Sequence, residues 1–212
     1  MNPFFLTSKS HTQPVSGYSP NHPSHLSVRV ATSADLLGLT DVLAESFHSR
    51  IGVLGWVYPI LRLGIYEDLR NRLANSSDYY VCLVAVSSNS TGSSVNQSAI
   101  ATDVLVGTVE MGLRSPNVWI ASRSRQFPYL SNLAVHPEFR RLGVAQQLLC
   151  RCESIAKQWG YSQLYLHVLE DNHPAKRLYF KAGYRLAEID RGWNSMLFGQ
   201  PKRLFMRKTL KT

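Results

Sequence analysis

The sequence predicts a single α/β domain, with one mixed, mostly antiparallel sheet and helices on both of its faces. The chain of 212 residues is 44% apolar, which suits one well-buried domain and is too short for two. Strand-like and helix-like segments alternate along it without an internal repeat. Every apolar run falls short of the roughly 18 residues that a membrane-spanning helix needs, so we expect no membrane span.

The first half of the domain is expected to contain two helices. Residues 1–27 have no acidic residue and no apolar periodicity, so we expect a flexible tail followed by a domain over residues 28–212. Thr32 and Asp35 form a capping pattern before a first helix, and apolar residues four apart along 61–73 mark one face of a second. The expected elements are a strand at 28–30, a helix from 33, an aromatic loop at 49–58, a helix at 59–73, and strands at 79–86 and 104–113.

The second half alternates strands and helices more regularly. The apolar segment PYLSNLAV at 128–135 predicts a strand, and apolar residues at helical spacing after Gly143 predict a helix. Gly160 and Gly183 stand where glycine commonly ends a helix. The expected elements are a strand at 128–135, a helix at 143–159, a strand at 163–169, a helix at 174–182, and strands at 184–190 and 203–208.

The charge and the cysteines limit the classes of function. Twenty-three Lys and Arg against fourteen Asp and Glu give a net charge of +9, which favours an anionic partner such as a phosphate-bearing cofactor. The basic residues are spread along the chain without a nucleic-acid motif, so we expect no nucleic-acid partner. Three cysteines make no disulfide framework, which fits a reducing, cytoplasmic location. No His, Cys, Asp or Glu group has metal-ligand spacing, so we expect no metal.

The segment LAVHPEFRRLGVA at 133–145 carries the clearest chemical signal. An apolar strand ends at Pro137, the chain turns, and an amphipathic helix opens with small residues from Gly143. Small residues leave backbone N–H groups accessible at a helix N-terminus, where these donors and the helix dipole attract anions. Arg140 and Arg141 add positive charge. The pattern therefore predicts a diphosphate-binding site.

Two motifs in this half of the chain follow one another in a defined order. Residues 140–145 read R-x-x-G-x-A after an L-A-V-x-P strand, and residues 166–184 read L-x-V-x-x-x-N-x-x-A-x-x-L-Y-x-x-x-G-[FY]. The first resembles the acyl-CoA signature of the GNAT N-acetyltransferase superfamily, and the second resembles its companion motif at every defined position. The resemblance covers about residues 28–208. It implies the acyl-CoA N-acyltransferase fold of that superfamily, with acetyl-CoA as cosubstrate.

The resemblance also implies which residues hold acetyl-CoA. The backbone of Leu133 and Val135 should pair with the pantetheine arm like an added strand, and the amides at 141–145 should hold the pyrophosphate. Asn172 matches an asparagine that meets the cofactor arm, and Tyr179 matches a tyrosine near the CoA sulfur. The alternatives are a packing role for this tyrosine and a solvated charge at Arg141. The implied cofactor-binding residues are Leu133, Ala134, Val135, Arg140, Arg141, Leu142, Gly143, Val144, Ala145, Asn172 and Tyr179.

Acetylation of an amine needs a base, because the amine must be neutral before it attacks. Histone-type members of the superfamily place a glutamate eleven residues before the signature arginine, where this chain has Tyr129. The chain resembles instead the Tyr/His-type protein N-terminal acetyltransferases, with His167 in an L-H-V strand. Alternation places His167 on the strand face opposite its two neighbours. We expect His167 as base assisted by Tyr129, and Tyr179 as general acid; the alternatives are a structural His167 and Glu110 as the base.

The resemblance also implies that the acceptor lies between two loops with aromatic residues, at 49–58 and 191–201. The expected substrate-binding residues are Trp56, Tyr58, Glu110 and Trp193. Residues 58–73 also resemble the cyanobacterial and plastid branch of the superfamily, which implies protein N-termini, lysines or arylalkylamines as acceptors and a plastid location if the host is eukaryotic. We expect protein α-amines or lysine ε-amines, acetylated in a ternary complex. The alternatives are a serotonin-like arylalkylamine or other small amine, and a non-catalytic acyl-CoA-binding module. We expect a monomer or homodimer.

Overall fold

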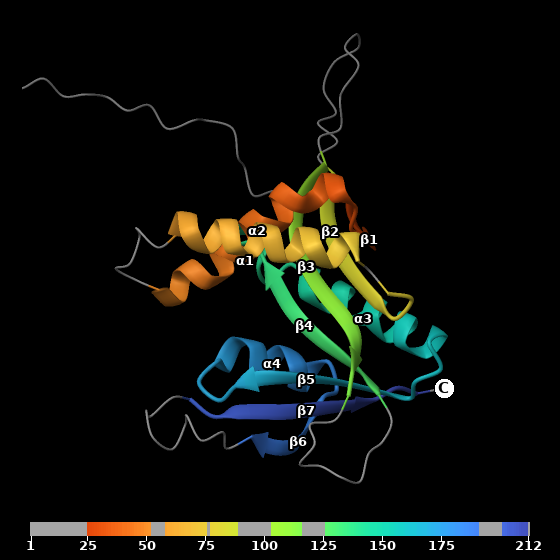
Figure 1. Ribbon diagram of the computed structural model, residues 1–212. Coiled ribbons are helices and arrows are strands. Elements are labelled where there is room, and N and C mark those ends of the chain that lie inside the picture. The colour runs from red at the N-terminus through yellow and green to blue at the C-terminus, as the bar shows by residue number, and fades with distance from the viewer. Residues whose placement is uncertain are drawn as a thin grey trace, which may run out of the picture.

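The computed structural model describes residues 25–51, 58–75, 77–88, 103–115, 126–190 and 201–211. Within these ranges, seven strands form one sheet in the order β1-β2-β3-β4-β5-β7-β6. All neighbouring strands are antiparallel except β4 and β5, which run parallel. The predicted mixed, mostly antiparallel sheet with flanking helices is confirmed, and Figure 1 shows its arrangement.

The helices and strands follow the predicted order. Their bounds are β1 His25–Val30, α1 Leu36–Ile51, α2 Tyr58–Ala74, β2 Tyr80–Ser88, β3 Asp103–Arg114, β4 Phe127–Val135, α3 Val144–Gln158, β5 Gln163–Leu169, α4 His173–Lys181, β6 Arg185–Asp190 and β7 Arg203–Thr209. Strand β1 begins three residues inside the predicted tail, because His25, Leu26 and Ser27 pair with the end of β2. This pairing also extends β2 to Ser88, beyond its predicted end. Residues 1–24 lie outside the described residues.

The core covers both faces of the sheet. On one face, α3 and α4 pack on alternate strand residues such as Val81, Leu83 and Leu166. On the other, α1 and α2 pack on the intervening residues such as Cys82 and Val84. The near-continuous apolar segment in β2 is explained by this double coverage, since both sides of the strand are buried. Figure 1 shows α1 and α2 in front of the upper sheet and α3 behind it.

One glycine lets the start of α3 approach the sheet closely. A Cβ atom added to Gly107 of β3 would lie 2.8 Å from Cγ1 of Val144 and 3.2 Å from the carbonyl oxygen of Ala134. A larger side chain would force these groups apart. Gly107 therefore allows the N-terminus of α3 to pack closely on β3 and on the end of β4.

Strands β4 and β5 separate soon after they meet. They pair at Tyr129–Tyr165 and Leu130–Leu166. Beyond these two pairs, the register of β4 against β3 shifts, and Asn132 has a left-handed backbone with φ of 52°. Such a bulge bends a strand. The bend opens a gap between the two strands in the middle of the sheet.

Candidate active site

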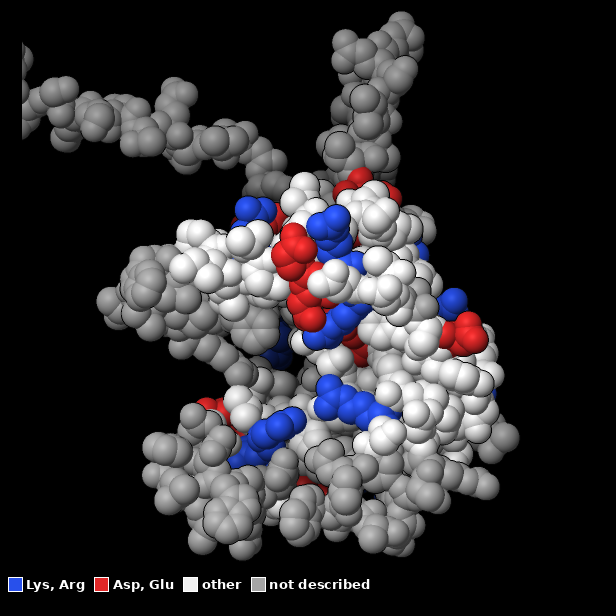
Figure 2. Space-filling model, viewed as in Figure 1, with Lys and Arg blue, Asp and Glu red and all other residues white. Residues whose placement is uncertain are grey.

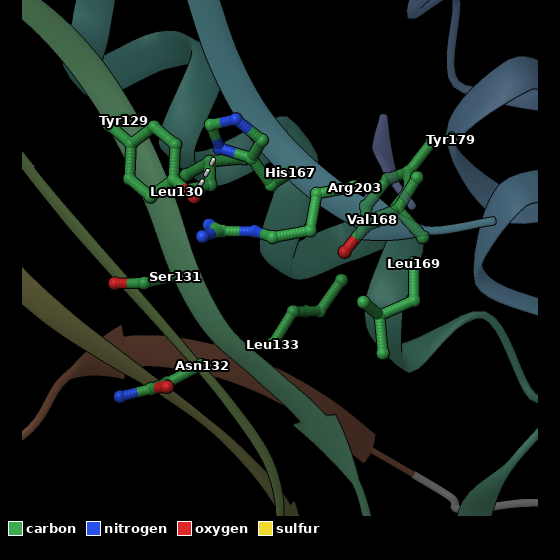
Figure 3. Close-up of a pocket in the computed structure, with 10 residues that line it drawn as sticks. All are labelled: Tyr129, Leu130, Ser131, Asn132, Leu133, His167, Val168, Leu169, Tyr179 and Arg203. Carbon is green, nitrogen blue, oxygen red and sulfur yellow. Dashed lines mark hydrogen bonds between the residues drawn. The ribbon is translucent and has the colours of Figure 1, made fainter. Parts of the chain in front are cut away.

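A cavity of about 250 Å³ fills the gap between β4 and β5. Its walls come from the bulged part of β4, the end of β5, one residue of α4 and the first residue of β7 (Figure 3). The residues that line it are Tyr129, Leu130, Ser131, Asn132, Leu133, His167, Val168, Leu169, Tyr179 and Arg203. All three predicted catalytic residues, from three different elements, therefore meet in one cavity.

Tyr129 and His167 are hydrogen-bonded at the mouth of this cavity. The Tyr129 hydroxyl lies 2.9 Å from Nδ1 of His167, and their ring centroids are 5.6 Å apart. The guanidinium carbon of Arg114 lies 3.8 Å from the centroid of the Tyr129 ring. Tyr129 is only 6% exposed, so its hydroxyl is held in one place beside the imidazole.

Tyr179 approaches the cavity from α4. Its side chain is buried, and burial together with the nearby Tyr129 raises the pKa of the phenol to about 12. Figure 3 shows its hydroxyl pointing into the cavity. The phenol therefore keeps its proton throughout the neutral and mildly alkaline range.

The cavity joins the two faces of the sheet. Leu130, Leu166 and Val168 belong to the core beneath α3 and α4, as does Tyr179. Tyr129 and His167 alternate with these residues along their strands, so they point to the opposite face. A group entering from the α3 side would meet Tyr179, and one entering from the other face would meet His167.

The start of α3 has the geometry of an anion site. Arg141 and Gly143 both have left-handed backbones, with φ of 69° and 83°, and no side chain caps the helix at Gly143. The first N–H groups of α3 are therefore available to a ligand. The side chains of Arg140, Arg141 and Leu142 are exposed beside them. These residues fit a pyrophosphate.

The other predicted cofactor-binding residues lie along β4 and at the start of α4. Leu133 lines the cavity, whereas Ala134 is buried beneath α1. Val135 pairs with Gly107 of β3, and its carbonyl oxygen accepts a hydrogen bond from Nε of Arg140 at 3.2 Å. Asn172 caps α4, where its Oδ1 accepts the Ala175 N–H at 3.3 Å.

Glu110 lies away from the cavity in a buried polar cluster. Its side chain is 2% exposed, and three donors from three elements contact its carboxylate. These are Nη1 of Arg72 at 2.8 Å, the Tyr80 hydroxyl at 2.9 Å and Nδ2 of Asn132 at 2.7 Å. Burial, the largest cause, together with this carboxylate raises the pKa of Tyr80. Because Asn132 also lines the cavity, Glu110 supports the bulge in β4.

The predicted acceptor residues lie largely beyond what the structure describes. Trp56 and Trp193 are outside the described residues. Tyr58 is the first residue of α2 and is half-buried, but it does not line the cavity.

The sequence reasoning missed Arg203, which lines the cavity. The pattern R-L-F-M at 203–206 places Leu204 and Met206 in the core. Strand alternation therefore puts Arg203 and Phe205 on the face that carries His167. The alternation was visible in the sequence, but only the pairing of β7 with β5 brings Arg203 to the site.

Two general features of the described residues bear on function. Across the described ranges, no helix is both long and apolar enough to cross a membrane. Within the same part of the chain, His, Cys, Asp and Glu side chains form no group of three or more that would hold a metal ion.

Comparison with known proteins identifies relatives for most of this chain. The protein is 32% identical over 175 residues to the chloroplastic GCN5-related N-acetyltransferase 10 of Arabidopsis thaliana, covering 79% of this chain and 64% of that protein. It is 36% identical over 84 residues to the chloroplastic GCN5-related N-acetyltransferase 7, covering 40% of this chain and 31% of the relative. This chain thus matches less than two thirds of the length of either relative.

The fold is shared with solved acetyltransferases. The PaiA N-acetyltransferase of Thermoplasma acidophilum, solved with coenzyme A, superposes with a TM-score of 0.62 at 20% identity, covering 87% of this chain and 99% of that one. The family model described as "Acetyltransferase (GNAT) family" matches residues 64–184, more than half of the chain. With the sheet, the separated strands and the α3 anion site in place, this match shows that the chain belongs to the GNAT acetyltransferase family.

Proposed function

We propose that this protein transfers an acetyl group from acetyl-CoA to a primary amine of a protein or peptide. The observation that carries the proposal is the cavity in which the bonded pair Tyr129–His167 faces Tyr179. A base on one side and a proton donor on the other are what direct transfer between two bound substrates requires.

The residues present fit acetyl-CoA. The free amides at the start of α3, with Arg140 and Arg141, would hold its pyrophosphate. Beyond Leu130, the edge of β4 that faces β5 has no strand partner in the described part of the chain, so it can pair with the amide-bearing pantetheine arm. When bound, acetyl-CoA supplies the acetyl group as a reactive thioester.

His167 takes the proton from the acceptor amine. Either neutral tautomer of a histidine has one ring nitrogen with a lone pair. With the proton on Nδ1, this nitrogen donates to the Tyr129 oxygen and Nε2 accepts the proton. With the proton on Nε2, Nδ1 accepts the Tyr129 O–H, and the proton reaches His167 through the phenol. Both arrangements agree with the 2.9 Å contact.

Tyr179 acts on the opposite side, where sulfur departs. Because its pKa is raised to about 12, the phenol stays protonated and donates a hydrogen bond to the sulfur as negative charge develops there. Because a thiol has an ordinary pKa of about 8.5, its thiolate is a good leaving group that a hydrogen bond is enough to stabilise. Tyr179 therefore does not have to become a permanent tyrosinate.

Peptide amines suit the open side of the site. Figure 2 shows this face hollowed between α2 above and the lower strands, with basic side chains on both sides of the hollow. A hollow of this kind admits the end of a peptide as well as a small molecule. The Tyr129–His167 pair further supports α-amines, in line with the resemblance to Tyr/His-type N-terminal acetyltransferases.

Acetyl transfer measured by mass spectrometry tests the proposal. The acceptors are peptides with a free N-terminus, N-blocked peptides with one lysine, and serotonin. Acetylation of the peptides supports the proposal, and the ratio of α to ε products ranks the two amines. Acetylation of serotonin alone makes the protein an arylalkylamine acetyltransferase. Binding of acetyl-CoA without transfer to any acceptor leaves an acyl-CoA-binding module.

The relatives also bear on location. The Arabidopsis relatives are named as chloroplastic proteins, which favours a plastid over the cytoplasm in a plant or algal host. Imaging of the full chain fused to a fluorescent protein in such a cell distinguishes the two compartments.

A further inference from the structure

Arg203 brings a permanent positive charge to the acceptor side of the cavity. Of the ten residues that line it, Arg203 is the only Lys or Arg, and none is Asp or Glu. Figure 3 shows its side chain reaching toward the side of the cavity where Tyr129 and His167 lie. Among the described residues, no ion pair or hydrogen bond is found for this guanidinium, in contrast to Arg72, which contacts Glu110.

The strand register explains why Arg203 reaches this place. It opens β7 opposite Leu169, and Phe205 lies opposite His167. Arg203 and Phe205 therefore share the face of His167, one pleat apart, or about 7 Å along the strand. The His167 and Phe205 rings are 4.7 Å apart. This packing leaves the longer arginine side chain to project over the end of β5 into the cavity.

A second cation lies at the same edge of the site. Arg114, the last residue of β3, covers the ring of Tyr129. The acidic side chain nearest in sequence to this strand end, Glu110, is already bound by Arg72, Tyr80 and Asn132. The space in front of Tyr129 and His167 is thus bordered by two guanidinium groups, and none of the residues that line the cavity is Asp or Glu. In the strand register, Arg203 also pairs with Asp190 of β6.

This charge arrangement discriminates among acceptors. A second positive charge on the acceptor, as in a polyamine, is repelled. A carboxylate close to the amine gains a two-pronged, charge-assisted hydrogen bond from the planar guanidinium.

We propose that Arg203 selects peptide acceptors that carry a carboxylate in the first or second residue next to the reacting amine. This inference rests on the proposed acetyltransferase function. It adds a substrate class, acidic N-terminal peptides, and a specificity residue that contacts the substrate rather than the acetyl donor.

The test compares peptides that differ only in charge. Free-N-terminus peptides with Glu or Gln in the first or second position are assayed by kcat/KM with wild type, Arg203→Gln and Arg207→Gln. Arg207 is the matched control, because it is exposed on the same face of β7 and does not line the cavity. We expect wild type to favour a Glu peptide by about tenfold. Arg203→Gln should lose this preference through a lower kcat/KM on Glu peptides, and Arg207→Gln should keep it.

Other outcomes separate this inference from the proposed function. Acetylation of Glu and Gln peptides at equal rates, or an equal loss on both in Arg203→Gln, overturns the inference and leaves the acetyltransferase in place. A raised KM for acetyl-CoA in Arg203→Gln, without an effect on peptide preference, assigns the guanidinium to the cofactor and also overturns it. Failure of every acceptor while acetyl-CoA binds overturns the proposed function itself. Arg203→Lys keeps the charge without the fork, and thermal unfolding confirms that each variant is folded.

Discussion

The Tyr129 hydroxyl and Nδ1 of His167 lie 2.9 Å apart across the point where β4 and β5 separate. In the strand register, Tyr129 lies opposite Tyr165, two residues before His167. The two side chains therefore lean toward each other diagonally over the opening of the cavity. Arg114 covers the tyrosine ring, and Phe205 packs on the imidazole, so the pair is held before any substrate arrives.

Replacement of His167 by Ala is expected to lower kcat about 100-fold or more, because general base catalysis contributes on this scale. The dissociation constant for acetyl-CoA should change little, since the proposed anion site lies at the start of α3. Steady-state kinetics from pH 6 to 9 and calorimetric binding measure both. Tyr129→Phe is the companion variant, because it keeps the ring and removes only the hydrogen bond to His167. Full activity in His167→Ala would refute the assignment of His167 as the base.

The Tyr179→Phe variant should keep its fold and lose about tenfold or more in kcat. In the proposed mechanism the lost group is a hydrogen-bond donor to the departing sulfur, so the effect should fall on kcat rather than on the KM for acetyl-CoA. Because burial raises the pKa of Tyr179 to about 12, its proton stays in place as pH rises to 10. The wild-type rate should therefore not fall between pH 8 and 10 through loss of the Tyr179 proton. A fall of the wild-type rate between pH 8 and 10 that is absent in Tyr179→Phe would contradict this role.

Gly143→Val should abolish acetyl-CoA binding at a modest cost in stability. Gly143 has φ of 83°, a conformation that costs a residue with a Cβ roughly 1–2 kcal/mol. Gly160 is a matched control, because its φ is 82° and an added Cβ at either glycine meets open space. Gly160→Val should lose similar stability and still bind acetyl-CoA. Equal binding by the two variants would show that the α3 amides do not hold the cofactor.

Glu110→Gln is expected to destabilise the fold by about 1–3 kcal/mol, because it removes a buried charge that accepts three hydrogen bonds. Chemical denaturation measures this loss. The pH profile of the remaining activity should keep the acid limb of wild type, since Glu110 supports Asn132 and does not line the cavity. A profile that loses this limb while His167→Ala keeps it would identify Glu110 as the base.

Asp35 ties β1 to the start of α1 in a manner that depends on pH. Its carboxylate accepts hydrogen bonds from Arg29 and from the Thr32 backbone, and the bond from Arg29 is the main cause that lowers its pKa to about 2. The resulting stability is present above the ordinary value near 4 and is lost as pH falls through 2. Because Arg29 is partly exposed, we expect about 1 kcal/mol. The difference in unfolding free energy between wild type and Asp35→Asn should shrink from that value at pH 7 toward zero at pH 2.

Much of the fold could be predicted because local patterns dictated it. Apolar spacing marked the helices, Thr32 and Asp35 marked a cap that the structure contains, and Gly160 and Gly183 take the left-handed conformation that ends α3 and α4. The predicted limits of β1 and β2 were wrong. His25, Leu26 and Ser27 form a strand only because they pair with the end of β2, which lies far away in the sequence. Polar residues at such ends have no pattern of their own.

The sequence by itself determined the family motifs, the pattern around Gly143 that predicts a diphosphate site, and the candidate residues for acetyl transfer, because each depends on neighbours within a few positions. Only the tertiary structure decided which candidates meet. It brought Tyr129, His167 and Tyr179 together and placed Glu110 among Arg72, Tyr80 and Asn132. It also added Arg203 from the far end of the chain. The physical reason is that strand register and the separation of β4 from β5 are set by packing between distant segments, which spacing along one segment does not encode.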